Sequence, residues 1–186
     1  MKNLFERSLI VLVFATLTLP VFAEETRANL DGKGNMIYLD RHHVDCGNKA
    51  LSSFGLFRPT SDTIAYKYKC SQASMGKAVS KETRANLDGG GNIIYLDRHQ
   101  VDCGDKALLG FKLFRPTKTT VAYLYKCGSK PLSKVSSFET RATIDGGGNV
   151  IYLDRQHVSC GNNYITSFRL FRPTSSTVAY KYGCGY

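Results

Sequence analysis

The sequence lacks tryptophan entirely, has only five prolines in 186 residues, and has no long hydrophobic run after residue 23. A membrane-spanning helix needs roughly 20 apolar residues, so none is expected in that part of the chain. No ten-residue stretch there has apolar residues at helical spacing, whereas short runs of alternating residues recur. The pattern predicts an all-β fold.

Several sequence motifs of metal binding and catalysis are also absent. No C-x₂-C pair occurs, which removes the usual zinc sites, and the turn 31–35 with Asp40 does not match an EF-hand because its positions 6 and 12 are Met36 and His42. No G-x-S-x-G element occurs, and no other catalytic arrangement stands out. We therefore expect no enzyme activity, no metal and no cofactor.

Three near-copies of one module fill the chain instead, repeating every 57 residues. Spacers of 11 residues each, rich in Ser and Lys, separate the copies and are expected to be flexible connectors. The predicted division is a signal peptide 1–23, repeat 1 at 24–70, a spacer 71–81, repeat 2 at 82–127, a spacer 128–138, and repeat 3 at 139–186.

The first 23 residues have the features of a secretory signal peptide. Lys2 and Arg7 give a basic start, an apolar run follows, and Val21-Phe22-Ala23 ends in the small-residue pattern of a cleavage site. Cleavage after Ala23 would start the mature chain at Glu24 and lower the formal net charge from +10 to about +9. We predict a soluble, secreted protein, extracellular or, in a bacterium, periplasmic.

Six cysteines in an exported chain predict disulfides. The repeat favours pairing within each copy, because that gives three loops of equal length. The alternative pairs Cys70 with Cys103 and Cys127 with Cys160, and leaves Cys46 for Cys184. The favoured pairs are Cys46–Cys70, Cys103–Cys127 and Cys160–Cys184.

Each repeat is expected to hold four strands, in repeat 1 at 26–30, 36–46, 52–58 and 63–70. The last strand alternates most clearly, with its tyrosines and its cysteine on one face. A module of 46 residues is too small to bury a sufficient core alone. We therefore predict a closed pseudo-threefold body, a β-prism or a β-trefoil-like fold with one disulfide per repeat. The alternative is three separate small β modules in tandem.

The number and length of the repeats, with a strand of the form Ala50-Leu51-x-x-Phe54-x-Leu56, resemble the three-repeat β-prism of egg vitelline-membrane outer-layer proteins. This is a resemblance of plan. It implies a prism built from three four-stranded sheets, and it carries over no residue role and no activity.

All four histidines fall in one window that occurs once per repeat, Asp-Arg followed by two residues that are His or Gln. Both side chains donate and accept hydrogen bonds, which suits recognition of hydroxyl groups, whereas a metal site would not exchange His for Gln. Alternatively, the Asp and Arg form ion pairs and the His/Gln pair is a solvated strand end. With one tyrosine per repeat as a stacking platform, the predicted ligand-binding residues are Tyr38, Asp40, Arg41, His42, Tyr95, Asp97, Arg98, His99, Tyr152, Asp154, Arg155 and His157.

These features predict a secreted, disulfide-stapled, multivalent binding protein, with lectin-like recognition of carbohydrate or cell-surface glycans as the first hypothesis. Three weak sites on one body would gain avidity on a repetitive surface. The alternatives are a structural coat or matrix protein and a cationic binder of anionic polymers or membrane surfaces. Nucleic acid is not an expected partner, because the lysines are scattered and the chain is exported.

Overall fold

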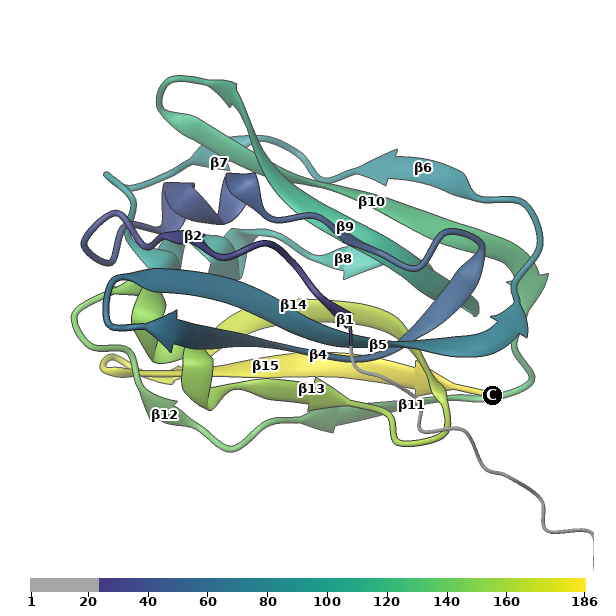
Figure 1. Cartoon of the computed structure of the whole chain (residues 1–186). Helices are drawn as coiled ribbons and strands as arrows, with labels where there is room; N and C mark the ends of the chain where they lie inside the picture. The colour runs from purple at the N-terminus through teal and green to yellow at the C-terminus, as the bar shows by residue number, and fades with distance from the viewer. Residues whose placement is uncertain (1–23) are drawn as a thin grey trace, which may run out of the picture.

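The computed structural model describes residues 24–186, so the predicted signal peptide lies outside the described residues. Three antiparallel sheets, each of five strands, surround a common core, and three short 3₁₀ helices lie together at one end of the body (Figure 1). Within residues 24–186, no helix is long and apolar enough to cross a membrane. The predicted all-β fold is confirmed.

The elements recur in the same order in each repeat. Repeat 1 contributes β1 (Glu24–Glu25), β2 (Asn29–Leu30), η1 (Met36–Arg41), β3 (Val44–Asp45), β4 (Lys49–Thr60) and β5 (Thr63–Ser74). Repeat 2 follows with β6 (Val79–Glu82), β7 (Asn86–Leu87), η2 (Ile93–Arg98), β8 (Val101–Asp102), β9 (Lys106–Thr117) and β10 (Thr120–Pro131). Repeat 3 contributes β11 (Val135–Glu139), β12 (Thr143–Ile144), η3 (Val150–Arg155), β13 (His157–Ser159), β14 (Tyr164–Thr174) and β15 (Thr177–Gly185).

The repeats exchange strands in a circle. Sheet A is built on β4 and β5 of repeat 1 but takes β13 from repeat 3. Sheet B is built on β9 and β10 of repeat 2 and takes β3 from repeat 1. Sheet C is built on β14 and β15 of repeat 3 and takes β8 from repeat 2. The exchanged strands are in register, with Val158 opposite Phe54, Val44 opposite Phe111 and Val101 opposite Phe168. No repeat can therefore complete its own sheet.

An aromatic cluster fills the centre of the body. The rings of Phe54, Phe111 and Phe168 come one from each sheet, are each 2% exposed, and have centroids 4.8 to 4.9 Å apart in every pair. One buried tyrosine per repeat packs edge-on against this trio. The closed pseudo-threefold body is thus correct, and the alternative of three separate modules is wrong, because the central contact belongs to all three repeats.

The disulfides pair within repeats as predicted, Cys46–Cys70, Cys103–Cys127 and Cys160–Cys184. Each bond nevertheless joins two sheets. Cys70 lies on β5 in sheet A, while the N–H of Cys46 donates to the carbonyl of Leu109 in sheet B at 2.8 Å. In the chain-entropy model, closing a loop of this length removes about 3 to 4 kcal/mol of unfolded-state entropy.

Two local expectations were wrong. The stretch 36–46, expected as an extended strand, starts with a 3₁₀ helix, because the side chain of Asn35 accepts the N–H of Ile37 at 3.0 Å and caps the turn. The spacers, expected as flexible connectors, contain most of β6 and of β11. Those strands pair with β10 and β15, whose outer edges would otherwise present unpaired main-chain groups.

The glycine-rich turns at 31–35, 88–92 and 145–149 lock the repeats together around the pseudo-threefold axis, where they line a shallow polar depression of about 460 Å³. A Cβ on Gly91 would lie 1.9 Å from the Asn35 side chain, so this position requires glycine for space as well as for its φ of 92°. The N–H groups that follow each turn donate to the next repeat, from Met36 to Gly91, from Ile93 to Gly148 and from Val150 to Gly34.

Lys33 is the one non-glycine residue of the described chain with positive φ, at 58°, where repeats 2 and 3 have Gly90 and Gly147. A left-handed conformation costs a side-chain-bearing residue about 1 kcal/mol or more, partly offset by the higher unfolded-state entropy of glycine. We expect Lys33→Gly to raise the free energy of unfolding by about 0.5 to 1 kcal/mol in urea titrations.

The reverse change, Gly90→Lys, should lower stability by a similar amount, because a Cβ at Gly90 meets nothing within 4 Å and only the backbone is strained. Unchanged unfolding midpoints in both variants would contradict a strained backbone at Lys33.

Candidate functional site

The predicted windows all lie at the end of a 3₁₀ helix. In repeat 1, Met36 and Leu39 of η1 point into the core, while Asp40 and Arg41 are exposed in its last turn and His42 caps it. The i, i+3 spacing of the two buried residues explains the helix, since residues three apart lie on one face of a 3₁₀ turn. The same arrangement recurs in η2 and η3.

The predicted tyrosine platforms are largely covered. The ring of Tyr38 packs directly on the main chain of Gly32, where an added Cβ would lie 2.1 Å from it, and the guanidinium of Arg41 lies 4.1 Å from its centroid. Tyr95 and Tyr152 repeat this, with Arg98 and Arg155 at 4.2 and 4.5 Å. These contacts occupy ring surface on which a sugar would stack.

His42 is 1% exposed and belongs to the core. Its Nδ1 is hydrogen-bonded at 2.9 Å to the hydroxyl of Thr26, which also accepts the N–H of Tyr66 at 2.9 Å. Burial, and secondarily the charge of Arg41, lower the pKa of His42 to about 4. The ring is neutral at pH 7 and, through Thr26, links the C-terminal cap of η1 to β5.

His99 and Gln156 occupy the same place in the other repeats, each 1% exposed. His99 bonds Thr83 at 3.0 Å, and burial lowers its pKa. Gln156 accepts from Thr140 and donates to the hydroxyl of Thr143 at 2.6 Å. The assignment of His42 and His99 to a ligand site is therefore corrected, because a buried hydrogen-bonded side chain of the fold does not reach a ligand.

The second residue of each His/Gln pair is the exposed one, and the strand exchange carries it onto the neighbouring sheet. His43, Gln100 and His157 each lie over the outer face of another repeat's sheet, His157 directly opposite Gly55 of β4. Of these, only His157 was among the predicted ligand-binding residues. Alternation distinguishes the two positions, because successive residues of an extended chain face opposite sides. The first residue of the pair lies an even number of residues from the buried positions that follow, and the second does not.

Each of these residues lines a depression on its sheet, with volumes of about 320 Å³ on sheet A, 240 Å³ on sheet C and 90 Å³ on sheet B. We call them the face depressions. All three contain the His/Gln residue together with two consecutive residues of the outer strand, Lys67 and Tyr68, Leu124 and Tyr125, or Lys181 and Tyr182.

Polar and cationic side chains complete the lining. On sheet A these are Ser53 and Asp154, so that one predicted aspartate does line a depression, whereas no depression described above includes Asp40 or Asp97. Sheet B adds Lys112 and Lys126, and sheet C adds Arg169 with two serines. Hydroxyl, imidazole or amide, and ammonium groups can together bind hydroxylated or anionic ligands.

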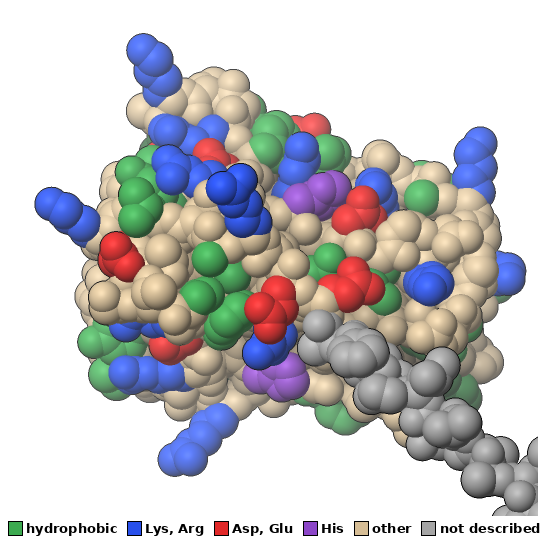
Figure 2. Space-filling view, in the orientation of Figure 1, with side chains coloured by type: hydrophobic (Ala, Val, Ile, Leu, Met, Phe, Trp, Pro, Cys, Tyr) green, Lys and Arg blue, Asp and Glu red, His purple; other side chains and the backbone are tan. Residues whose placement is uncertain are grey.

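Several of these cations have carboxylate partners. Lys67 lies 3.1 Å from Glu25, Lys181 lies 3.5 Å from Glu139, and Lys126 lies 2.8 Å from Asp45. Burial alone would raise the pKa of Asp45, but the bond from Lys126 and the N–H of Gly47 outweigh burial and lower it. Figure 2 shows Lys and Arg interspersed with Asp and Glu over one face, so the charge forms no single basic patch there.

Aromatic surface adjoins two of the depressions. Phe57 lines the one on sheet A, with the ammonium of Lys67 4.8 Å from its ring centroid. On sheet C, Phe138 is 47% exposed and stacks on Tyr182 at 5.8 Å between centroids. Sequence reasoning missed both rings. Phe138 falls at the end of a region that was expected to be a spacer.

Within residues 24–186, no three His, Cys, Asp or Glu side chains gather in a way that could hold a metal ion. No protein-family model, no curated protein and no solved structure matches this chain. The resemblance to the vitelline-membrane proteins therefore remains one of plan.

Proposed function

We propose that this chain is an exported, multivalent, lectin-like carbohydrate-binding protein whose sites are the three face depressions. The observation that carries the proposal is their repetition: three sheets of one closed body each present a hollow with a His or Gln at the same place. Single sugar sites are weak, and three on one rigid body gain avidity on a repetitive surface by 10²-fold or more when they engage together.

Two further features support this function. The exchange of His for Gln preserves a planar group that both donates and accepts hydrogen bonds, which is what a sugar hydroxyl needs. Three disulfides are typical of proteins from oxidising compartments, where glycans are displayed.

A glycan array probed with the oxidised protein tests the proposal, followed by titration of any hit. We expect His43→Ala, Gln100→Ala or His157→Ala each to remove one of three sites, and the triple variant to lose array binding by about 10²-fold or more. Lys118→Ala, on an exposed hairpin tip away from the depressions, is the control and should bind like the unchanged chain. Full retention by the triple variant would show that the depressions are not the sites.

A cationic binder of anionic polymers is the second candidate, because Lys112, Lys126, Arg169 and Lys181 line two of the depressions. Salt separates the two functions, since screening weakens attraction between exposed charges. Binding to neutral glycans that persists at 1 M salt supports the lectin. Binding only to sulfated or carboxylated polymers, lost at 1 M salt, supports the cationic binder.

A further inference from the structure

The three sheets differ at one outer edge. In sheets B and C, the outer strands β10 and β15 are covered by β6 and β11, whose pairing continues to Cys127 and Gly185. In sheet A, β1 pairs only with Lys67 and Tyr68 of β5. Among residues 24–186, no strand therefore covers the outer side of β5 beyond Tyr68.

The main chain of this edge faces outward. The carbonyl of Tyr66 accepts the N–H of Thr26, which lies on the outer side of β5. Alternate residues of an antiparallel strand bond to the same side, so Cys70 directs its N–H and C=O groups outward as well. At the position of Gln72, sheet B has Ser129, whose N–H donates outward to the carbonyl of Met75 at 2.9 Å. Such an edge is a ready template for another strand.

A second element is present in sheets B and C but has no described counterpart in sheet A. Before β6, Met75 is 5% exposed and its N–H donates to the carbonyl of Asn48 at 2.8 Å. Before β11, Leu132 makes the corresponding bond to Asp105 at 2.7 Å. Both aliphatic side chains pack at the end of the body that carries the disulfides, beside Ala50, Ala107 and Leu109.

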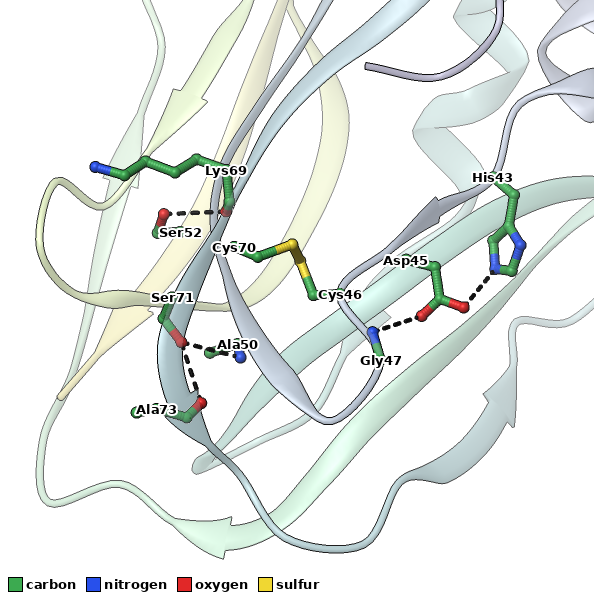
Figure 3. Close-up of a disulfide and its surroundings, with 10 residues drawn as sticks. All are labelled: His43, Asp45, Cys46, Gly47, Ala50, Ser52, Lys69, Cys70, Ser71 and Ala73. Atoms are coloured by element: carbon green, nitrogen blue, oxygen red, sulfur yellow. Dashed lines mark hydrogen bonds and ion pairs between the residues drawn. A yellow bond between two sulfur atoms is a disulfide. The ribbon is translucent and has the colours of Figure 1, made fainter. Parts of the chain in front are cut away.

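At the matching place in sheet A, the structure has a cavity of about 310 Å³. Gln72 and Ala73 of β5 line one side, and Asn162 and Tyr164 of repeat 3 line another. Figure 3 shows the neighbouring Ser71 bonded to the N–H of Ala50 and the carbonyl of Ala73, with the Lys69 side chain extending away. The cavity continues the open edge of the strand.

We propose that the outer edge of β5 from Lys69 to Ala73, with this cavity, binds an extended peptide segment of a partner protein as an added antiparallel strand. The proposal applies to the chain that remains after the predicted cleavage at Ala23. It is independent of carbohydrate binding.

The segments that cover the corresponding edges of sheets B and C, here called the sister sheets, indicate the kind of peptide, or guest, that would bind. Each has an apolar residue (Met75 or Leu132), then a short bend, and then Val79 or Val135 at the start of the paired strand. A second copy fits less well, because its own open edge, 69–74, has the sequence Lys-Cys-Ser-Gln-Ala-Ser and offers no large aliphatic side chain. Peptide segments bound in this way gain affinity from the main chain and specificity from the pocket.

One residue of the edge differs between sheet A and the sister sheets, and it affects how tightly a peptide can bind. Ser71 stands where the sister sheets have Gly128 and Gly185, and a Cβ at either glycine would lie 2.7 Å from the inserted Met75 or Leu132 side chain. A guest that copies the sister segments therefore meets the Ser71 side chain. We expect Ser71→Gly to tighten binding of such a guest.

The test uses the exported chain, its start read by mass spectrometry, and a fluorescent peptide of the sequence 131–139, Pro-Leu-Ser-Lys-Val-Ser-Ser-Phe-Glu. Fluorescence polarisation should show saturable binding, about tenfold tighter to Ser71→Gly, and about tenfold or more weaker to Gln72→Pro, which lacks the outward N–H. A peptide with Leu132→Asp and Val135→Asp should not bind.

A second variant, which covers the edge of β5 with its own added residues, tests the proposal even if Gln72→Pro does not fold. Residues 75–80, Met-Gly-Lys-Ala-Val-Ser, placed directly before Glu24 in a Ser71→Gly background, should cover the edge from within and abolish peptide binding. Equal binding of the peptide to all variants, or none to any, would overturn the proposal. So would a concentration-dependent dimer that Gln72→Pro abolishes, which assigns the edge to a second copy, or an exported chain that retains the residues before Glu24 on this edge.

Discussion

Phe111→Ala should lower the free energy of unfolding of the whole protein by about 3 to 5 kcal/mol, the range for removing a buried aromatic side chain. Phe111 is 2% exposed and lies 4.8 Å from both Phe54 and Phe168, between ring centroids. The lost ring leaves a cavity that borders all three repeats. Urea denaturation followed by circular dichroism should still show one transition, shifted as a whole.

The same strand provides the control. Phe114 of β9 lies only half-buried, so Phe114→Ala should cost well under half as much. If Phe111→Ala instead split the transition, with most of the signal unfolding as before, the repeats would be independent units.

Stability should fall as the pH drops from about 6.5 to 4, and His42→Gln with His99→Gln should remove most of that fall. The pKa of His42 is lowered to about 4 by burial and then by Arg41, and burial lowers the pKa of His99. In this pH range the unfolded chain binds protons that the folded chain excludes, so acid favours unfolding. The shift at His42 corresponds to about 3 kcal/mol, fully lost below pH 4.

Repeat 3 supplies the reason for choosing glutamine. Gln156 fills the same buried place and hydrogen-bonds Thr140 and Thr143, so the double variant should fold with its stability at pH 7 little changed. His157→Gln, at an exposed position, is the matched control and should keep the acid sensitivity of the unchanged chain. The measurement is the urea midpoint between pH 4 and 7.5, and an unaltered slope in the double variant would place the acid-sensitive group elsewhere.

The sequence alone predicted the features that follow from periodicity and composition. The 57-residue repeat and equal cysteine spacing led to the correct disulfides, and the alternation ending at Cys70 led to the buried face of β5. A threonine 16 residues before each buried His or Gln, as in Thr26 and His42, was a further signal of a structural pair.

Strand exchange could not be predicted in this way. With near-identical repeats, β3 has the same apolar pattern whether it pairs with its own sheet or with the next one, so no local signal distinguishes the two. The candidate site depends on this choice, because the exchange is what sets His157 opposite Gly55. The same limit applies to the spacers, whose strands form only because β10 and β15 offer an edge.

The three repeats fold as one body, on which the face depressions and the open edge both depend. The most direct measurement is circular dichroism and amide exchange on an oxidised fragment of residues 24–81, which holds one repeat and its disulfide. We predict an unfolded fragment, because β3 pairs in sheet B and β13 is missing from sheet A. A fragment that unfolds cooperatively with the stability of the whole chain would show that one repeat folds without the other two.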